Sequence, residues 1–378
     1  MKKWMKHYGM PTCLVLVIFF VISMDRGLFA GRHEEVKEVG EVSAQNVSAE
    51  KAFCGMDIPY KYKGDINARN RIDAAIDAPD IIRKEGFRKA SARIADVPEA
   101  SILALLEERY HPYEGEEYDN IRQYLGEDEM CLSFSRMYQE FFMRCRTADY
   151  IRMAYRDQPT DDCNKERYAL EAELPDFQLA DCDQRIKEVF RSYGTDSGFR
   201  IVHSTLDHDT MEQEALELHA DGTWTKPDYA WSADDDSYYC RVWQLCNGIP
   251  VAHGYMLQSY GDILNQGSHT LVLNKERILQ MDMTEVYDVR YGQEQEPLLD
   301  FDKVIGRYGQ ITEAAGETYA IEITDIGLRV IGVDEGGGKY RMAPIWIFYG
   351  TKTYEDGGAN MPFAMMMDAV TGDELWEL

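Results

Sequence analysis

Apolar residues are spaced differently in successive parts of this 378-residue chain. An unbroken apolar run covers 13–22, and residues 31–95 then carry many charges and turn residues with few large apolar side chains. Between 96 and 160 apolar positions recur every three or four residues, which is typical of amphipathic helices. Beyond 161 they mostly alternate, which indicates half-buried strands. The pattern predicts an acidic, largely disordered tether over 31–95, a helical segment over 96–160, and sheet-forming modules after it.

Two helices are expected within 96–160. The first follows Pro98, which suits a first helical turn, and continues through an apolar stripe at 102–106. The second is expected over roughly 130–153, where aromatic and apolar side chains recur at intervals of three and four residues. A stripe of this kind is more often the core face of a helix than a cofactor site, and no cofactor is expected.

The rest of the chain repeats one arrangement, a helix followed by a three-stranded meander, in a first module at 161–260 and a second at 261–378. In the first module a strand is expected over 167–174, a helix over 180–193 that ends at Gly194, and strands over 199–203, 214–218, 238–244 and 250–255. In the second, strands are expected over 270–273, 277–289, 319–333, 339–349 and 363–370, with a helix over 300–307. Asp221-Gly222 and Asn247-Gly248 are strong hairpin signals. The predicted fold class is α+β: two antiparallel sheet modules, each with a packing helix, preceded by a helical segment and an N-terminal membrane signal.

Residues 1–30 have the composition of an export signal. Lys2, Lys3 and Lys6 precede the apolar run at 13–22, and a basic start before a short apolar run is the signature of a secretory signal. The run is shorter than the roughly 20 residues that span a bilayer. Ala30 offers a cleavage site, although Leu28 before it is a poor match, so a cleaved signal peptide and a retained signal anchor both remain open. Either places the body outside the cytoplasm, and membrane contact is expected only for the uncleaved form.

Removing this segment makes the charge balance more acidic. The whole chain has a formal net charge of −27, and residues 1–30 contribute +3 (four Lys or Arg, one Asp), which leaves −30 on the remainder. Such a body is repelled by nucleic acid and by anionic membrane surfaces. Basic proteins, cations or a cationic wall component remain candidate partners, and solubility alone is the simpler explanation of the charge.

Seven cysteines follow the apolar run, so in an oxidising compartment at least one has no disulfide partner within the chain. Cys240 and Cys246 are expected on one strand, about 20 Å apart, and cannot bridge to each other. No pairing of cysteines with histidines has the local spacing of a zinc motif. The thiols are therefore interpreted as small buried apolar residues.

A short polar run contains the candidate metal ligands. His203, Asp207 and His208 bring two imidazoles and a carboxylate together within seven residues, and zinc accepts both ligand types. The run is expected in a loop, where polar residues are common without a metal, so these three residues are candidates and no metal is assigned. No catalytic residue is assigned either, because the chain lacks the Gly-x-Ser-x-Gly and His-Glu-x-x-His motifs.

The end of the chain carries two motifs. Residues 340–350 read YRMAPIWIFYG, and residues 365–372 read MMMDAVTG. The first is a strand that is apolar on both faces, which predicts a central position covered on each side. The second predicts a turn in which the Asp368 carboxylate accepts backbone hydrogen bonds.

Together with 239–251 and 298–305, these motifs resemble a group of uncharacterised exported Gram-positive proteins. The group includes a domain of unknown function, DUF6034, and is similar to extracytoplasmic Yyc-type regulators and PepSY modules. The resemblance covers about 165–378 and marks four structural positions, none of them catalytic: Pro344, Trp346, Asp368 and Gly372. The chain differs in having Asp368 where the group prefers asparagine, and in lacking a lipoprotein cysteine.

The resemblance implies a non-enzymatic extracytoplasmic protein that binds or modulates a protein partner at the cell envelope. Two other interpretations remain open. One is a secreted hydrolase or metal-dependent enzyme that uses His203, Asp207 and His208. The other is a structural cell-surface component whose acidity keeps it hydrated.

Overall fold

The computed structural model describes residues 57–106, 111–113, 121–126, 130–135, 140–157, 163–195, 197–219, 222–252, 269–314, 319–354 and 360–377. The expected export signal at 1–30 and the first part of the expected tether lie outside these residues. Within the described part of the chain, no helix combines the length and the apolar composition that crossing a membrane requires.

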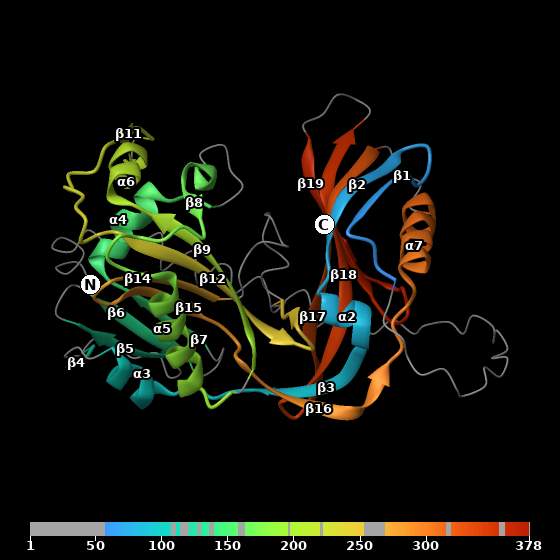
Figure 1. Ribbon diagram of the computed structural model, residues 1–378, viewed down its shortest axis with the longest axis horizontal. Coiled ribbons are helices and arrows are strands. Elements are labelled where there is room, and N and C mark those ends of the chain that lie inside the picture. The colour runs from blue at the N-terminus through green and yellow to red at the C-terminus, as the bar shows by residue number, and fades with distance from the viewer. Residues whose placement is uncertain are drawn as a thin grey trace. The chain divides into compact units, whose positions relative to one another are not determined.

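One large sheet has eight strands (Figure 1). They are β1 (Lys61–Asp65), β2 (Asn70–Asp77), β3 (Phe87–Ile94), β16 (Tyr287–Glu296), β17 (Tyr319–Gly336), β18 (Lys339–Tyr354), β19 (Met361–Asp368) and β20 (Glu374–Glu377). The order is β1-β2-β17-β18-β19-β20, with β3 paired to β18 and β16 paired to β3. Every neighbouring pair is antiparallel except β2 and β17. Helix α2 (Asp80–Glu85) connects β2 to β3.

Helix α7 (Phe301–Ala314) covers one face of this sheet. The rings of Phe301 and Trp346 meet edge to face at a centroid distance of 5.3 Å, and Tyr308 stacks on Phe348 at 4.6 Å. All four side chains belong to the same buried core. Helix and sheet are thus joined by aromatic packing, which removes a large apolar area from water.

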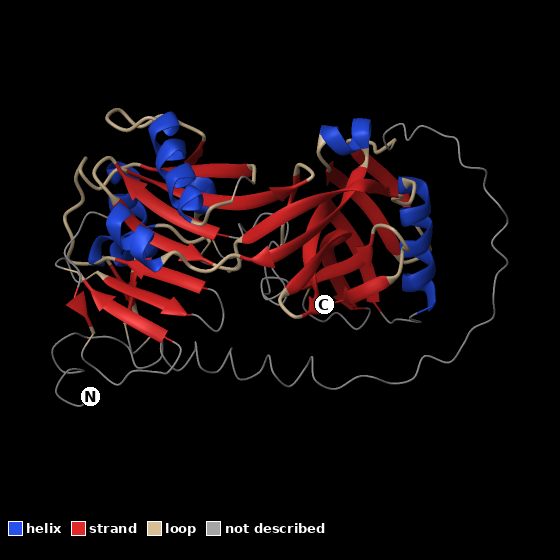
Figure 2. Ribbon diagram, turned by 90° about the horizontal axis from the view of Figure 1, so that it is seen from below, coloured by secondary structure: helices blue, strands red, loops and turns tan. Residues whose placement is uncertain are grey.

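The second large sheet has ten strands, in the order β4-β5-β6-β7-β15-β14-β12-β9-β8, with β13 paired to β12. They are β4 (His111–Pro112), β5 (Ile121–Leu125), β6 (Cys131–Ser135), β7 (Glu140–Arg144), β8 (Ala169–Leu170), β9 (Phe199–Leu206), β12 (Ser237–Cys246), β13 (Ile249–Pro250), β14 (His269–Asn274) and β15 (Ile278–Met283). Its helices are α3 (Glu99–Leu105), α4 (Arg146–Ala154), α5 (Leu179–Ser192) and α6 (His208–Glu214), with a 3-10 turn at Lys165–Arg167. Helix α5 packs through Cys182 on the sheet face that carries Cys240, whereas Tyr155 at the end of α4 contacts Tyr239 on the opposite face. The helices (blue in Figure 2) share one core with the strands. A separate hairpin pairs β10 (Glu217–Leu218) with β11 (Trp224–Thr225).

Several sequence predictions are confirmed. The α+β class is correct, with antiparallel sheets dominant and few helices. The helix expected over 180–193 is α5, and Gly194 after it has the left-handed φ of 71°. Asn247 and Gly248, with φ of 53° and 75°, turn β12 into β13 as the hairpin signal predicted. The strands expected over 319–333, 339–349 and 363–370 are β17, β18 and β19, and a further strand, β20, follows them.

The tether prediction is wrong for residues 61–94, which form β1, β2, α2 and β3. In β2 the side chains of Ile72, Ala74 and Ile76 are buried on one face. The middle residue of the three, Ala74, is small, so only Ile72 and Ile76 are large apolar residues in this strand. The alternation of buried and exposed positions was therefore not recognised from the sequence. Pairing with β17 supplies the core that this segment cannot build alone.

The prediction of a helix over 130–153 is wrong for most of that range. Residues 131–135 and 140–144 are the antiparallel strands β6 and β7, and only 146–154 is helical. Leu132 and Phe134 face the core together with Phe141 and Met143. Within each strand the buried residues recur at every second position. When both strands were taken as one continuous run, the combined spacing resembled that of a helical stripe.

Other element boundaries also differ. The strand expected over 167–174 is reduced to β8, and the strand expected over 277–289 is divided into β15 and β16, which lie in different sheets. Residues 208–214, expected near a loop, form α6, and α7 extends to Ala314, well past the expected end at 307.

The division into modules at 161–260 and 261–378 does not match the sheets. Strands β14 and β15 follow residue 261 but pair with β12 and β7 in the ten-stranded sheet. Strands β1, β2 and β3 precede residue 96 but complete the eight-stranded sheet. The chain therefore passes between the sheets more than once, because strand pairing is decided by tertiary contacts rather than by order along the chain.

Candidate functional site

The candidate ligands His203, Asp207 and His208 do not form one site. His203 lies in β9 with only 4% of its surface exposed. Asp207 is the N-cap of α6, where its carboxylate accepts the backbone N–H of Thr210 at 2.9 Å. His208 begins α6 and places Nδ1 2.8 Å from Asp236 Oδ1. His203 is buried in a strand, Asp207 caps a helix and His208 pairs with Asp236. The three predicted ligands therefore do not come together.

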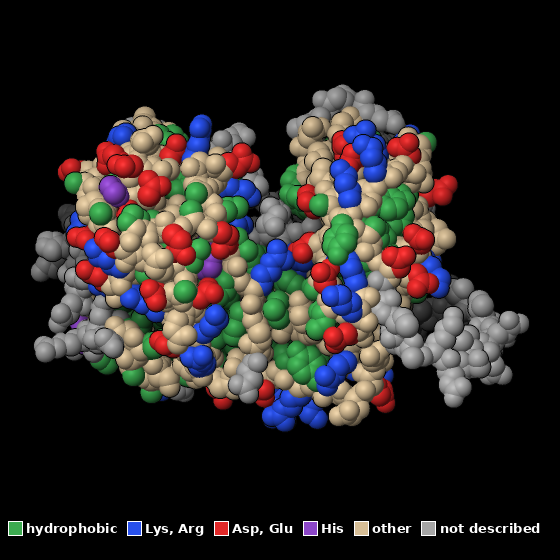
Figure 3. Space-filling view, viewed as in Figure 1, with side chains coloured by type: hydrophobic (Ala, Val, Ile, Leu, Met, Phe, Trp, Pro, Cys, Tyr) green, Lys and Arg blue, Asp and Glu red, His purple; other side chains and the backbone are tan. Residues whose placement is uncertain are grey.

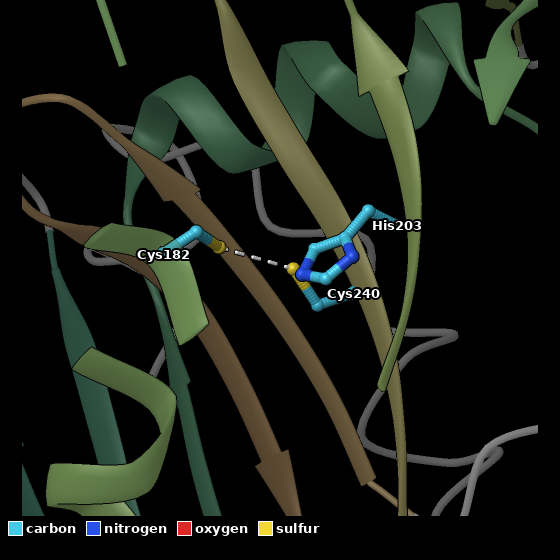
Figure 4. Close-up of side chains that lie close together, drawn as sticks. All are labelled: Cys182, His203 and Cys240. Atoms are coloured by element: carbon cyan, nitrogen blue, oxygen red, sulfur yellow. Dashed lines mark hydrogen bonds between the residues drawn. The ribbon is translucent and has the colours of Figure 1, made fainter. Parts of the chain in front are cut away.

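His203 instead meets two cysteines from distant parts of the chain (Figure 4). It lies opposite Cys240 in the antiparallel pairing of β9 with β12, which places both side chains on one face of the sheet. Cys182 comes from α5, on the same buried stripe as Ile186 and Val189. One ligand atom from each of Cys182, His203 and Cys240 lies within 4.8 Å of the other two.

The cluster is closely spaced and buried. Cys182 Sγ lies 3.5 Å from Cys240 Sγ, and both cysteines have no exposed surface. Glu171 holds the imidazole in place, because Oε2 lies 2.9 Å from His203 Nδ1 and Oε1 accepts the backbone N–H of His203 at 2.8 Å. The Nε2 atom is left on the side of the sulfurs. It lies 3.2 Å from Asp183 Oδ1, but within the described residues neither atom makes an aligned hydrogen bond.

The electrostatics of these groups are strongly coupled. The neighbouring Cys240 sulfur lowers the pKa of Cys182 to about 7, against the opposing effect of burial and with help from His203. Burial lowers the pKa of His203, but the nearby Cys182 sulfur and the Glu171 carboxylate outweigh it and raise that pKa to about 9. Burial holds the pKa of Cys240 well above its usual value.

Sequence reasoning missed this cluster because its members are 21 and 37 residues apart. Zinc motifs are recognised from cysteines or histidines two to five positions apart on one local element. Here the proximity depends on the register of β9 against β12 and on the rotation of α5. His203 was selected from the sequence, but with the wrong companions.

A second feature is a surface hollow of about 380 Å³ beside α6. It is lined by His208, Asp209, Glu212, Pro227, Asp228, Tyr229, Ala230 and Trp231, so no Lys or Arg is among its described lining residues. Lys226 is adjacent and places Nζ 3.8 Å from Glu212 Oε1. Over the face seen in Figure 3, acidic and basic side chains are intermixed, whereas the ionisable lining of the hollow consists of three carboxylates, His208 and the Tyr229 hydroxyl.

The aromatic wall of the hollow is held in position. Tyr229 stacks on Tyr150 at a centroid distance of 4.1 Å and meets Trp231 edge to face at 4.8 Å. Its hydroxyl donates to Asp235 Oδ1 at 2.6 Å, while Asp235 Oδ2 accepts the backbone N–H of Ser232 at 2.8 Å. His208 also lines the hollow, and hydrogen bonding to Asp236 raises its pKa. The hollow therefore combines fixed aromatic rings with exposed carboxylates, a combination that attracts cations.

The four positions marked by the terminal motifs have structural contacts. Pro344 lies in β18 opposite Val330, and Trp346 is fully buried against α7. Asp368 Oδ1 accepts the backbone N–H groups of residues 370 and 371 at 2.7 and 3.0 Å, as the predicted turn requires. Gly372 has φ of 74° and donates its N–H to the Asp368 carbonyl at 2.9 Å.

The central position predicted for the first motif is also confirmed. Strand β18 lies between β17 and β19. Trp346 and Phe348 belong to one buried core, whereas Ile345 and Ile347 belong to another on the opposite side.

No family model and no curated protein matches the chain. Among solved structures, the fold is similar to that of an uncharacterized protein from Eubacterium rectale. The TM-score is 0.57 and the sequence identity 13%, with 84% of this chain and 94% of that chain covered. At this identity the likeness concerns the fold alone.

Proposed function

We propose that this protein is a non-enzymatic extracytoplasmic binding protein that engages a cationic segment of a protein partner at the cell envelope. The observation that carries the proposal is the hollow beside α6, which is lined by the carboxylates of Asp209, Glu212 and Asp228 and by the rings of Tyr229 and Trp231. Lysine and arginine side chains suit such a lining, because a cation gains from both the ring faces and the negative charges.

The composition supports the same partner chemistry. A net charge of −27 over the chain attracts basic surfaces over distances of about 10 Å at moderate ionic strength. The lysines before the apolar run at 13–22 support delivery across a membrane. The terminal motifs support kinship with the DUF6034 group and with Yyc-type and PepSY modules, whose members are expected to act through contact.

A direct test uses a short oligolysine peptide and follows binding by tryptophan fluorescence or calorimetry. Trp231→Ala is expected to weaken binding about fivefold, since a cation–π contact at an exposed site contributes about 1 kcal/mol. Asp228→Asn is expected to weaken oligolysine binding more at low salt than at high salt, because salt screens the attraction between exposed charges. Trp224→Ala is the matched control, because Trp224 is an exposed tryptophan on β11 that does not line the hollow.

A second experiment looks for the partner in the native envelope. A photoreactive amino acid is placed at Asp228 in the hollow and, as a control, at exposed Leu375 on β20. Selective crosslinking at Asp228 to a protein through a Lys- or Arg-rich segment is the expected result. Equal oligolysine affinity for the parent chain and Trp231→Ala, with the same crosslinks at both positions, would favour a purely structural surface component.

The enzyme interpretation based on His203, Asp207 and His208 is not carried forward. Those side chains have separate partners in β9 and α6, so no shared substrate or metal position unites them.

A further inference from the structure

The buried cluster of Cys182, His203 and Cys240 takes no part in the proposed binding function. We propose that it is a structural zinc site, in which the two cysteine sulfurs and His203 Nε2 bind one Zn²⁺ ion. The site would join helix α5 to strands β9 and β12.

The donor atoms have the chemistry and spacing that zinc requires. Zinc binds cysteine sulfur at about 2.3 Å in tetrahedral geometry, so two sulfurs on one ion lie about 3.8 Å apart. The observed separation of Cys182 Sγ and Cys240 Sγ is 3.5 Å. Opening this separation by a few tenths of an ångström is a small side-chain adjustment.

The histidine is oriented as a zinc ligand. Ligating histidines almost always give their other ring nitrogen to a carboxylate, carbonyl or water, which fixes the tautomer and the ring plane. Glu171 does this at His203 Nδ1, at 2.9 Å. The Nε2 atom is buried and makes no aligned hydrogen bond within the described residues, while Figure 4 shows the ring edge turned toward the sulfurs.

Asp183 is placed to supply the fourth ligand. Its Oδ1 atom lies 3.2 Å from His203 Nε2, near the separation of about 3.3 Å expected for nitrogen and oxygen ligands on one tetrahedral zinc ion. Its Oδ2 atom lies 3.4 Å from Lys187 Nζ, one helical turn further along α5. Asp183 is outside the tight three-residue group, so a side-chain rotation is required to complete the coordination.

A disulfide between Cys182 and Cys240 is the competing use of these sulfurs. It accounts for their proximity, but it uses neither the Nε2 atom directed at them nor the carboxylate that holds the ring. Zinc uses all of these groups.

The test measures the metal content of the full chain, purified anaerobically without an affinity tag. We expect a zinc-to-protein ratio near one, and Co²⁺ substitution should give the intense visible bands of a tetrahedral site together with sulfur-to-cobalt charge transfer. Cys182→Ser, Cys240→Ser and His203→Ala should lose the metal. Cys246→Ser is the matched control, because Cys246 is buried on the same strand as Cys240 but lies outside the cluster.

Because a polar residue at a buried position can itself prevent folding, two further measurements are independent of those variants. Glu171→Gln should still fold and bind zinc about 10- to 100-fold more weakly, as expected for loss of a carboxylate behind a ligating histidine. The parent chain, stripped by a chelator, should regain both zinc and its melting temperature on addition of ZnCl₂. The inference is overturned if the anaerobic chain binds neither Zn²⁺ nor Co²⁺, if Cys182→Ser retains the metal, or if peptide mapping of protein from its native compartment recovers a Cys182–Cys240 disulfide.

Discussion

Glu140 is a half-buried carboxyl group in β7, and replacing it with glutamine should change how stability depends on pH. Burial, with a smaller contribution from the charge of Glu285, raises the pKa of Glu140 from 4.5 to about 7. A change of one unit in a pKa corresponds to about 1.4 kcal/mol, so the ionised Glu140 side chain disfavours the folded state by at most about 3 kcal/mol. Residual contact with water makes this an upper limit.

The sign follows from proton uptake. Between pH 4.5 and about 7 the folded chain keeps a proton on Glu140 that the unfolded chain has lost, so the free energy of unfolding falls as pH rises through this window. Below pH 4.5 both states are protonated and the effect disappears. Glu140→Gln removes the ionisation, so it should be close to the parent in stability at pH 4 and more stable by up to about 3 kcal/mol at pH 8.

Urea unfolding of both chains, followed by circular dichroism at pH 4, 6 and 8, measures this difference directly. Asp282, whose pKa burial raises to about 6, contributes to the pH dependence of both chains and cancels in the comparison. Glu166→Gln, at an exposed position of the 3-10 turn, is the matched control and should show no pH-dependent difference. An equal stability difference between Glu140→Gln and the parent at pH 4 and pH 8 would refute the reasoning.

Three further substitutions test the eight-stranded sheet by urea unfolding. Trp346→Ala empties the space beside Phe301 and should cost about 3–5 kcal/mol, whereas Trp346→Phe should cost less; equal losses would contradict a packing role. Asp368→Ala removes the acceptor of two backbone N–H groups and should cost about 1–2 kcal/mol, whereas Asp368→Asn retains a carbonyl oxygen and should be close to neutral. Gly350→Ala would place a Cβ atom 1.9 Å from the Glu322 carbonyl oxygen, so a loss of about 4 kcal/mol or more is expected, and a variant with near-parental stability would show that β17 and β18 can separate there.

Local signals in the sequence were sufficient where one element carried the whole pattern. The α5 helix has its apolar stripe and terminal glycine within 16 residues, from Leu179 to Gly194. The motif around Trp346 is apolar on both faces, so a covered central strand was the physically consistent interpretation. The Asp368 turn was likewise predictable, because aspartate closes a turn through its own neighbouring backbone.

Patterns failed where burial came from a distant segment. The alternation of Ile72, Ala74 and Ile76 is too weak to predict a core strand, and its burial depends on pairing with β17, about 250 residues later. The run from β6 into β7 was misread as a helix because side chains from two paired strands happened to fall at helical spacing.

The sequence by itself determined the acidic composition, the α+β class and the strands β17, β18 and β19. Only the tertiary structure decided which chemical groups meet. His203 was visible in the sequence, but its neighbours are chosen by the pairing of β9 with β12 and by the packing of α5. Side-chain proximity across a sheet depends on register, and register is set by the burial of whole faces rather than by any local motif.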